Sequence, residues 1–378
     1  MEQPVVWWPR RDAGRTHGPH TEPEPEPEAD PSPSATSPLV DRRGRALRDL
    51  RLSVTDRCNF RCVYCMPREV YDTRHAFLPH AELLTFEEMR LAAQAFVQLG
   101  VEKIRLTGGE PLLRKEVEVL VAMLAGLRTP HGLKPELAMT TNGSLLARKA
   151  RALKDAGLDR VTVSLDAMDD EVFLRMNDAG VRVAEVLAGI EAALEAGLTP
   201  LKVNMVVRRG LNDQQIVPMA AYFRRRPVEL RFIEYMDVGH TNGWRMDEVL
   251  PSSEVLGLLQ EAFDLLPDGG KPHGQTAERW RHADAPGRIG LISSVSRAFC
   301  ADCERARLTT NGQMYSCLFA PQGHDLKGVL RSGATVEAVA AQVARIWRVR
   351  EDRYSELRGD AQRRTAAGHR AEMSFIGG

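Results

Sequence analysis

The chain has 378 residues, of which 43% are hydrophobic, and its 51 Lys and Arg balance its 51 Asp and Glu, so the formal net charge is zero. A dedicated nucleic-acid binder usually shows a basic excess, and this balance argues against one. No apolar run reaches the roughly 18 residues that span a bilayer, which argues against a membrane protein. Six cysteines in a chain of this length do not make a secreted disulfide scaffold, so we expect a cytoplasmic protein.

Residues 1–40 differ in composition from the rest of the chain. The run TEPEPEPEADPSPSATSP consists largely of Pro, Glu and Ser and offers almost nothing to bury. This composition predicts a disordered arm.

From residue 51 onward, short β-rich runs alternate with segments of helical periodicity. Thr85 and Glu88 form a capping-box pattern that opens one helix, and Gly100 ends it. Pro111 suits the first position of the next helix, whose buried stripe includes Val117 and Leu124. The predicted strands are 51–55, 103–107, 137–141, 160–166, 201–207 and 229–235.

Strand–helix alternation predicts βαβ units and a parallel sheet. Six units suit either an incomplete β/α barrel or an open doubly wound sheet. Polar motifs follow the first, second, third, fourth and sixth strands: CNFRCVYC, TGGEP, TTNG, SLD and EYM. Side chains with chemical roles gather at the carboxyl ends of barrel strands. The sequence therefore favours an α/β fold with an incomplete (β/α)6 TIM-like barrel over residues 41–240.

After residue 240 the alternation stops. A helix is predicted at 252–263, followed by a Pro- and Gly-rich loop at 267–287. Residues 241–332 form a predicted C-terminal region with a second cysteine group in strand-like surroundings. Residues 333–378 are expected to contain one amphipathic helix and a Gly-Gly tail.

The cysteines fall into two groups of three. The first triad, Cys58, Cys62 and Cys65, has the spacing C-x3-C-x2-C; the second triad, Cys300, Cys303 and Cys317, has C-x2-C-x13-C. Structural zinc sites use four ligands, and neither triad completes one by itself. Three thiolates on a 4Fe–4S cluster would leave one iron open to an external ligand. Zinc, disulfides and iron–sulfur clusters remain the alternatives at this point.

Among these alternatives, the iron–sulfur cluster is favoured because the motifs resemble those of a known superfamily. C-x3-C-x2-C after the first strand, with TGGEP after the second, resembles the radical S-adenosylmethionine (SAM) superfamily. RDLRLSVTDRCNFRCVYCMP, the second triad with CERARL, and the terminal Gly-Gly together resemble the GTP 3′,8-cyclase family over about residues 41–378. This resemblance implies a lyase that takes the first step of molybdenum-cofactor biosynthesis. A 5′-deoxyadenosyl radical would remove the ribose 3′ hydrogen, and the carbon radical would attack C8 of guanine.

The resemblance also implies the cofactors and the site residues. Two 4Fe–4S clusters would be bound by the two triads, the first with SAM and the second with the guanine of GTP. The implied SAM contacts are Tyr64, Gly109, Ser164 and Met236. The implied GTP contacts are Arg51, Arg105, Thr140, Lys202, Arg305, Ala306 and Arg307, with Arg231 and Glu110 as further candidates. Gly377 and Gly378 would form a catalytic tail that enters the active site.

Several of these residues suit their roles on physical grounds. A triphosphate needs fixed cations, and arginine offers a planar fork of donors. Arg305 and Arg307 alternate in a strand and therefore face one side. Glycine lacks Cβ, so a ligand can approach Gly108 and Gly109 closely. Ordinary structural roles are the alternative for each residue: a solvated charge for an arginine, a lid on the cluster for Tyr64, core packing for Met236, and a strand-end hydroxyl for Thr140.

Two other functions agree less well with the sequence, and the resemblance also implies partners. A peptide-modifying radical-SAM maturase usually carries more C-terminal cysteines, and a zinc-stabilised interaction protein gives no reason for the strand-end motifs. The resemblance implies an electron donor of flavodoxin or ferredoxin type, a transient contact with cyclic pyranopterin monophosphate synthase, and a monomer or homodimer. The acidic arm and the segment FLRMNDAGVRV depart from the family pattern.

Overall fold

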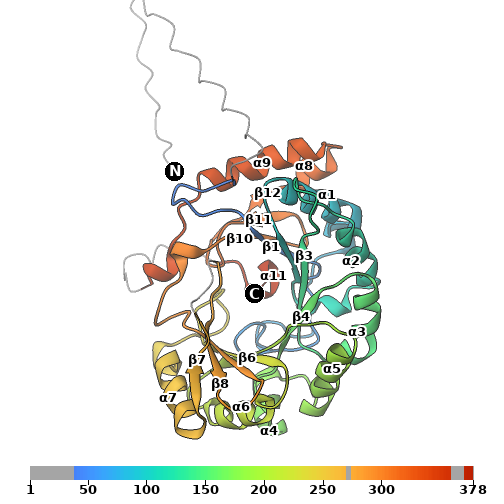
Figure 1. The fold of residues 1–378 in the computed structure, drawn as a ribbon. Coiled ribbons are helices and arrows are strands. Elements are labelled where there is room, and N and C mark those ends of the chain that lie inside the picture. The colour runs from blue at the N-terminus through green and yellow to red at the C-terminus, as the bar shows by residue number, and fades with distance from the viewer. Residues whose placement is uncertain (1–37, 270–273, 359–369, 378) are drawn as a thin grey trace, which may run out of the picture. The chain divides into compact units, whose positions relative to one another are not determined.

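The computed structural model describes residues 38–269, 274–358 and 370–377 (Figure 1). The predicted disordered arm, apart from residues 38–40, and the tail residue Gly378 lie outside these ranges.

Six parallel strands in chain order form the centre of the sheet. Their bounds are β1 (Asp49–Ser53), β2 (Lys103–Thr107), β3 (Glu136–Thr141), β4 (Arg160–Ser164), β5 (Leu201–Val207) and β6 (Val228–Glu234). Each strand pairs in parallel with the next one along the chain. The predicted α/β fold with a parallel sheet is confirmed, and β2 and β5 have the predicted bounds.

The connecting helices cover the outer face of the curved sheet (Figure 1). They are α1 (Phe86–Gln98), α2 (Val117–Ala125), α3 (Leu146–Asp155), α4 (Asp170–Asn177), α5 (Val183–Glu195) and α6 (Ile216–Phe223). The predicted capping box opens α1: Glu88 N donates to Thr85 Oγ1 over 3.2 Å, and Thr85 N donates to Glu88 Oε2 over 2.8 Å. Met89, Phe96 and their neighbours on one stripe of α1 are buried against the strands, which is the packing that the 3.6-residue period requires.

The C-terminal region extends the same sheet at both edges. Its elements are α7 (Ser252–Ala262), β7 (Leu265–Pro267), β8 (Glu278–His282), β9 (Arg288–Ile292), β10 (Arg305–Leu308), β11 (Gln313–Tyr315), β12 (His324–Asp325), α8 (Lys327–Arg331), α9 (Val336–Arg348) and α11 (Met373–Ile376). Strand β10 lies parallel to β1, and β9 lies parallel to β6. The strand order is β12-β11-β10-β1-β2-β3-β4-β5-β6-β9-β8-β7, so within the described part of the chain no pairing joins the two ends of the sheet.

The local structure differs from the prediction at two connections. Pro111 opens a short 3-10 turn, η2 (Pro111–Leu113), and α2 begins only at Val117, so the single predicted helix is two elements. Two helices, α4 and α5, connect β4 to β5. Further 3-10 turns are η1 (His80–Glu82), η3 (Asp213–Gln215), η4 (Met246–Glu248), η5 (Cys300–Asp302) and η6 (Tyr354–Glu356). Among the residues described here, none of the helices has the length and apolar character of a membrane span.

Candidate active site

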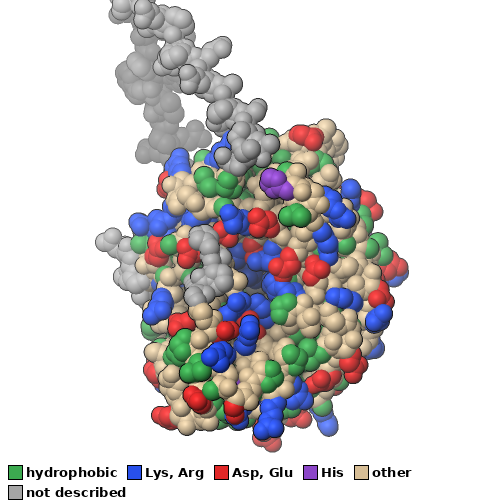
Figure 2. Space-filling view, viewed as in Figure 1, with side chains coloured by type: hydrophobic (Ala, Val, Ile, Leu, Met, Phe, Trp, Pro, Cys, Tyr) green, Lys and Arg blue, Asp and Glu red, His purple; other side chains and the backbone are tan. Residues whose placement is uncertain are grey.

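One cavity at the carboxyl ends of the parallel strands is lined by both cysteine triads. The first triad lies on the loop after β1, and the second lies just before β10 and just after β11. In the space-filling view, Lys and Arg side chains lie in and around a hollow on this face (Figure 2). The fold thus brings together two groups of thiols that are distant in the sequence and surrounds them with positive charge.

The first triad is partly buried and its thiols are free. The amides of Cys65 and Met66 both donate to the carbonyl oxygen of Cys62, over 2.9 Å, which winds the loop tightly. Burial raises the pKa of Cys58 to about 12 and also raises that of Cys62 and Cys65, with the neighbouring thiolates adding to the rise. Without a bound cation these side chains stay protonated, so a group that binds here must itself stabilise the thiolates.

The geometry of the triads bears on which group they can hold. Within the described ranges, no three His, Cys, Asp or Glu side chains converge as the ligands of a single metal ion would. The thiolates of a 4Fe–4S cluster bind different irons and need not converge on one point, whereas zinc ligands must. Each triad supplies three free thiols to the cavity, one fewer than the four ligands of a closed zinc site and enough to leave one iron of a 4Fe–4S cluster open.

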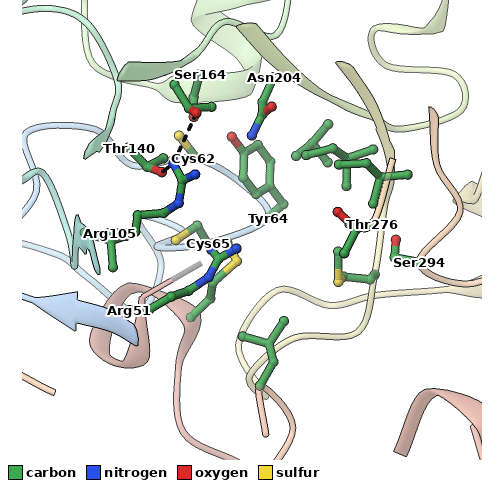
Figure 3. Close-up of a pocket in the computed structure, with 18 of the residues that line it drawn as sticks. Arg51, Cys62, Tyr64, Cys65, Arg105, Thr140, Ser164, Asn204, Thr276 and Ser294 are labelled. Carbon is green, nitrogen blue, oxygen red and sulfur yellow. Dashed lines mark hydrogen bonds between the residues drawn. The ribbon is translucent and has the colours of Figure 1, made fainter. Parts of the chain in front are cut away.

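Tyr64 is held between two cysteines of the first triad by a hydrogen bond across the cavity. Its hydroxyl donates to Asp166 Oδ2 over 2.9 Å, and Asp166 Oδ1 accepts from the amide of Val206 over 2.9 Å. Burial raises the pKa of Asp166 to about 6. Figure 3 shows Tyr64 beside Asn204 and close to the sulfurs of Cys62 and Cys65. Asp166 fixes the tyrosine ring at the mouth of the first triad.

Gly108 and Gly109 are required by the protein backbone itself. A Cβ on Gly108, whose φ is +124°, would lie 2.3 Å from the carbonyl oxygen of Thr55, and one on Gly109 would lie 2.2 Å from that of Arg57. Both approaches are closer than real Cβ contacts permit. The structure thus adds a second reason for this glycine pair: it allows the end of β2 to pack directly against the turn that leads into the first triad.

Glu110 connects the ends of β2 and β3. Its carboxylate accepts from the amides of Leu112 and Asn142 over 3.0 and 2.7 Å and from the hydroxyl of Thr141 over 2.8 Å. Burial raises its pKa to about 7, although these donors act in the opposite direction. The motif TGGEP is thereby joined to TTNG beneath the cavity.

The second triad differs from the first in its electrostatics. Burial alone would raise the pKa of Cys303, yet the guanidinium groups of Arg305 and Arg350 bring it down to about 6. Burial, with Asp352 nearby, raises the pKa of Cys317 to about 12. At neutral pH the second triad therefore already favours one thiolate.

Basic side chains from five strands form a cluster between the triads. Arg51 on β1 stands in register with Arg105 on β2 and with Arg307 on β10, and Lys202 and Arg231 follow on β5 and β6. Arg105 donates to the hydroxyls of Thr140 and Thr162, each over 3.1 Å, and Figure 3 shows Arg51 and Arg105 directed into the cavity. Because side chains alternate between the two faces along a strand, these five residues and Arg305 on β10 face the same side of the sheet.

The basic cluster is short of negative charge. Burial lowers the pKa of Arg51 to about 10; Asp49 opposes this fall, and repulsion from Arg305 adds to it. Burial, followed by repulsion from Arg51 and Arg160, lowers the pKa of Arg105 to about 9. The pKa of Lys202 falls to about 7 for the same reasons, although Glu229 partly offsets them. A polyanion bound here would relieve this repulsion, so the cluster has the electrostatics of a phosphate site.

The C-terminal segment enters the cavity from its open side. The short helix α11 lies in the middle of the sheet's concave side (Figure 1), and Met373 lines the cavity. Arg307 donates to the carbonyl oxygen of Gly377, and a Cβ on Gly377 would lie 2.3 Å from Thr107 Cγ2. The last described residue therefore sits between β1, β2 and β10, where a side chain would clash.

Most of the predicted site residues line the cavity; among the described residues, Lys202, Ala306 and Gly377 do not. Lys202 Nζ lies 3.8 Å from Glu229 Oε2, and the side chain of Ala306 is buried in the hydrophobic core. Two further lining residues lie in predicted elements: Asn142 in the motif TTNG and Asn204 in the predicted strand 201–207. Sequence reasoning missed other lining residues, namely Thr162, Thr276, Ser294, Phe299, Ser316, Phe319 and Met373. The inward alternation of β4 could have identified Thr162, whereas the loop residues carry no comparable signal.

Two family models match the chain. Residues 52–223 match the Radical SAM superfamily, and residues 228–356 match Molybdenum Cofactor Synthesis C. Among curated relatives, a GTP 3′,8-cyclase of Acidothermus cellulolyticus is 49% identical over 365 residues, covering 91% of this chain and 100% of that protein. A GTP 3′,8-cyclase of Staphylococcus saprophyticus is 45% identical over 341 residues, covering 90% and 99%.

Among solved structures, Streptococcus suis SuiB bound to S-adenosylmethionine is similar with a TM-score of 0.57. The two share 12% sequence identity, and the match covers 86% of this chain and 72% of that one. At this identity the likeness supports the fold alone.

Proposed function

Since the chain belongs to the GTP 3′,8-cyclase family of the radical SAM superfamily and catalyses the first step of molybdenum-cofactor biosynthesis, we propose which of its residues carry out each part of the reaction. The product is (8S)-3′,8-cyclo-7,8-dihydroguanosine 5′-triphosphate. The observation that supports this division is that two cysteine triads and a buried basic cluster line one cavity.

In this proposal the first triad holds a 4Fe–4S cluster with SAM at its open iron, and the second triad holds another whose open iron takes the guanine. When bound, the first cluster and SAM would supply the 5′-deoxyadenosyl radical that removes the ribose 3′ hydrogen. Closing the C3′–C8 bond would leave a radical on the purine, and one electron from the proposed reductant and one proton would then give the 7,8-dihydro product. Tyr64, fixed by Asp166, covers the first triad. Ser164, Gly109 and Met236 complete the SAM side of the cavity.

The basic cluster binds the triphosphate and so sets the position of the ribose. Arg105 is oriented by Thr140 and Thr162, while Arg305 and Arg307 extend from the second triad toward Arg51. Fixed donors of this kind lower the entropy cost of placing the 3′ carbon opposite the radical source. Arg231 and Lys202 share Glu229 as counter-ion, so a phosphate group here competes with a carboxylate already in place.

The tail has a separate role in the proposal. Arg307 binds the carbonyl oxygen of Gly377, so tail docking and phosphate binding involve the same guanidinium. A short segment without bulky side chains can cover the substrate and exclude water, which protects a reactive carbon radical.

The remaining parts of the proposal concern compartment and partners. All six cysteines are free thiols, which fits the reducing cytoplasm. A flavodoxin- or ferredoxin-like donor would reduce the first cluster, and the product would pass to cyclic pyranopterin monophosphate synthase.

Anaerobic reconstitution tests the proposal. We expect about eight irons per chain, as two four-iron clusters require. With dithionite and SAM, release of 5′-deoxyadenosine should depend on GTP, and GTP should alter the electron paramagnetic resonance spectrum of the second cluster. A protein that binds iron but whose SAM cleavage and spectra are unaffected by guanine nucleotide would contradict it.

The Cys300→Ser variant separates the two triads. It should retain SAM cleavage at the first cluster and lose the cyclised product, because only the guanine site is damaged. Normal product formation by this variant would refute the role given to the second triad.

A further inference from the structure

A buried ion cluster lies directly behind the second triad. Asp41 Oδ2 accepts from Arg45 Nε over 2.6 Å and from Arg350 over 3.2 Å, and these three side chains are at most 2% exposed. Asp41 and Arg45 belong to a turn closed by the bridge between Val40 and Ala46, whereas Arg350 follows α9. The cluster thus links the segment before β1 to the segment after α9.

Each arginine of this cluster binds the backbone of a cysteine. Arg45 donates to the carbonyl oxygen of Cys300 over 2.9 Å, and Arg350 donates to that of Cys303 over 2.8 Å. The 3-10 turn η5, which carries Cys300, and the residues that follow it to Cys303 are outside the sheet ladder. The two guanidinium groups therefore supply fixed contacts that the sheet does not give this segment.

The third cysteine is linked to the same cluster through Asp352. Arg45 donates to the carbonyl oxygen of Asp352 over 2.6 Å, and the carboxylate of Asp352 accepts from the hydroxyl of Ser316 over 2.5 Å, next to Cys317. Arg350 is further held over the ring of Trp347, with its guanidinium carbon 4.4 Å from the ring centroid. All three cysteines are thereby positioned from one network.

The energetics argue that this network does more than stabilise the fold. Burying three charges is costly, and apolar residues of similar volume often give equal or greater stability. What apolar side chains lack is donors aimed at the cysteine carbonyls. Partners behind the ligands of a metal site orient those ligands, and their removal typically weakens metal binding by about 10- to 100-fold.

We infer that Arg45 and Arg350, held by Asp41, are positioning residues that preorganise the second triad for its iron–sulfur cluster. This inference rests on the proposed function, since it requires that the second triad binds a cluster. It assigns a role to the segment that precedes β1 and to the end of α9, neither of which lines the cavity.

The test uses the full chain with the first triad replaced by alanine, so that iron reports the second cluster alone. In this background the paired variant Asp41→Asn/Arg350→Gln removes one charge of each sign, takes away the donor to the carbonyl oxygen of Cys303 and leaves Arg45 without the carboxylate that orients it. We expect it to lose iron to a chelator about 10-fold faster than the background does. Arg345→Gln, an exposed position on α9, is the matched control and should leave the rate unchanged.

A second measurement needs no metal. In the cluster-free protein, alkylation of Cys300, followed by mass spectrometry, should be about 10-fold faster in the paired variant, because the loop is released. Arg350→Lys keeps the charge and one donor and should recover part of the protection. Circular dichroism checks that each variant is folded; if the paired variant is not, Arg350→Lys against Arg345→Gln carries the comparison.

The outcomes distinguish the inference from the proposed function. A background protein that takes up no iron would refute the second cluster, and the inference would fail with it. Iron uptake with equal chelation and alkylation rates in the paired variant and the control would overturn the inference alone.

Discussion

Replacing Asp237 with asparagine is expected to destabilise the protein by about 3 kcal/mol, the lower end of the cost of breaking a buried ion pair. Asp237 follows β6, and its carboxylate accepts from Tyr354 Oη over 2.6 Å, Arg358 Nε over 2.8 Å and Arg370 over 3.2 Å. The side chains of Arg358 and Arg370 are only 8% and 12% exposed. The amide would remove the negative charge that two largely buried guanidinium groups share.

Urea unfolding of the metal-free protein measures this effect. Asp247→Asn is the matched control, because its ion pair with Arg245 is 65–70% exposed and such pairs contribute at most about 1 kcal/mol. A lower unfolding midpoint with an unchanged slope is expected for Asp237→Asn alone. Equal midpoints in the two variants would refute the reasoning.

The pH dependence of the folding stability tests the same prediction. Burial alone would raise the pKa of Asp237, but Arg358, Tyr354 and Arg370 together lower it below its ordinary value. A carboxyl whose pKa is lowered in the folded state stabilises the protein above its unfolded pKa, about 4, and loses that contribution as the pH falls through the folded value. The difference between wild type and Asp237→Asn should therefore be full at pH 7 and shrink below about pH 4.

Three further predictions concern the cavity. Gly109→Ala places a Cβ 2.2 Å from the carbonyl oxygen of Arg57, so iron bound by the first triad, measured after reconstitution, should fall severalfold; full iron content would show that the turn adapts. Tyr64→Phe leaves Asp166 without its 2.9 Å donor, and SAM affinity measured by equilibrium dialysis should weaken by about 10-fold, or about 1.4 kcal/mol; unchanged affinity would contradict the positioning role. Burial lowers the pKa of Lys202 to about 7, and a bound phosphate would raise it, so GTP affinity measured by calorimetry should decrease from pH 6 to pH 8. Lys202→Met should make GTP affinity less dependent on pH. An equally steep pH dependence in both proteins would exclude Lys202 as its source.

The sequence predicted the local elements well because periodicity is a local property. The run KIRLT alternates and is β2, and the capping box at Thr85 opens α1 as expected. The same alternation placed Arg305 and Arg307 on one side of a strand. The 3-10 turn at Pro111 was not predicted, because proline suits the first turn of either helix type.

The arrangement of distant segments was beyond sequence reasoning. Nothing in the run RARL indicates that β10 pairs in parallel with β1, because such a pairing depends on contacts far along the chain. The position of Lys202 in its strand led to the prediction that it contacts substrate. How deep in the fold Lys202 is held by Glu229 depends on the curvature of the sheet, which the sequence does not show. The contact between Arg350 and Cys303 likewise has no sequence signature, because nothing in the segment around Arg350 indicates that it reaches the second triad.

The ion cluster that joins Asp41 to Arg350 also imposes an order on biogenesis. The loop after β1 that carries the first triad leaves the ribosome early, whereas Arg350 is translated after every strand of the sheet. Because synthesis is slower than the formation of local structure, the segment that carries the first triad can fold before Arg350 is available to the second triad. If the two triads bind clusters as proposed, the second triad should therefore be loaded last in the cell.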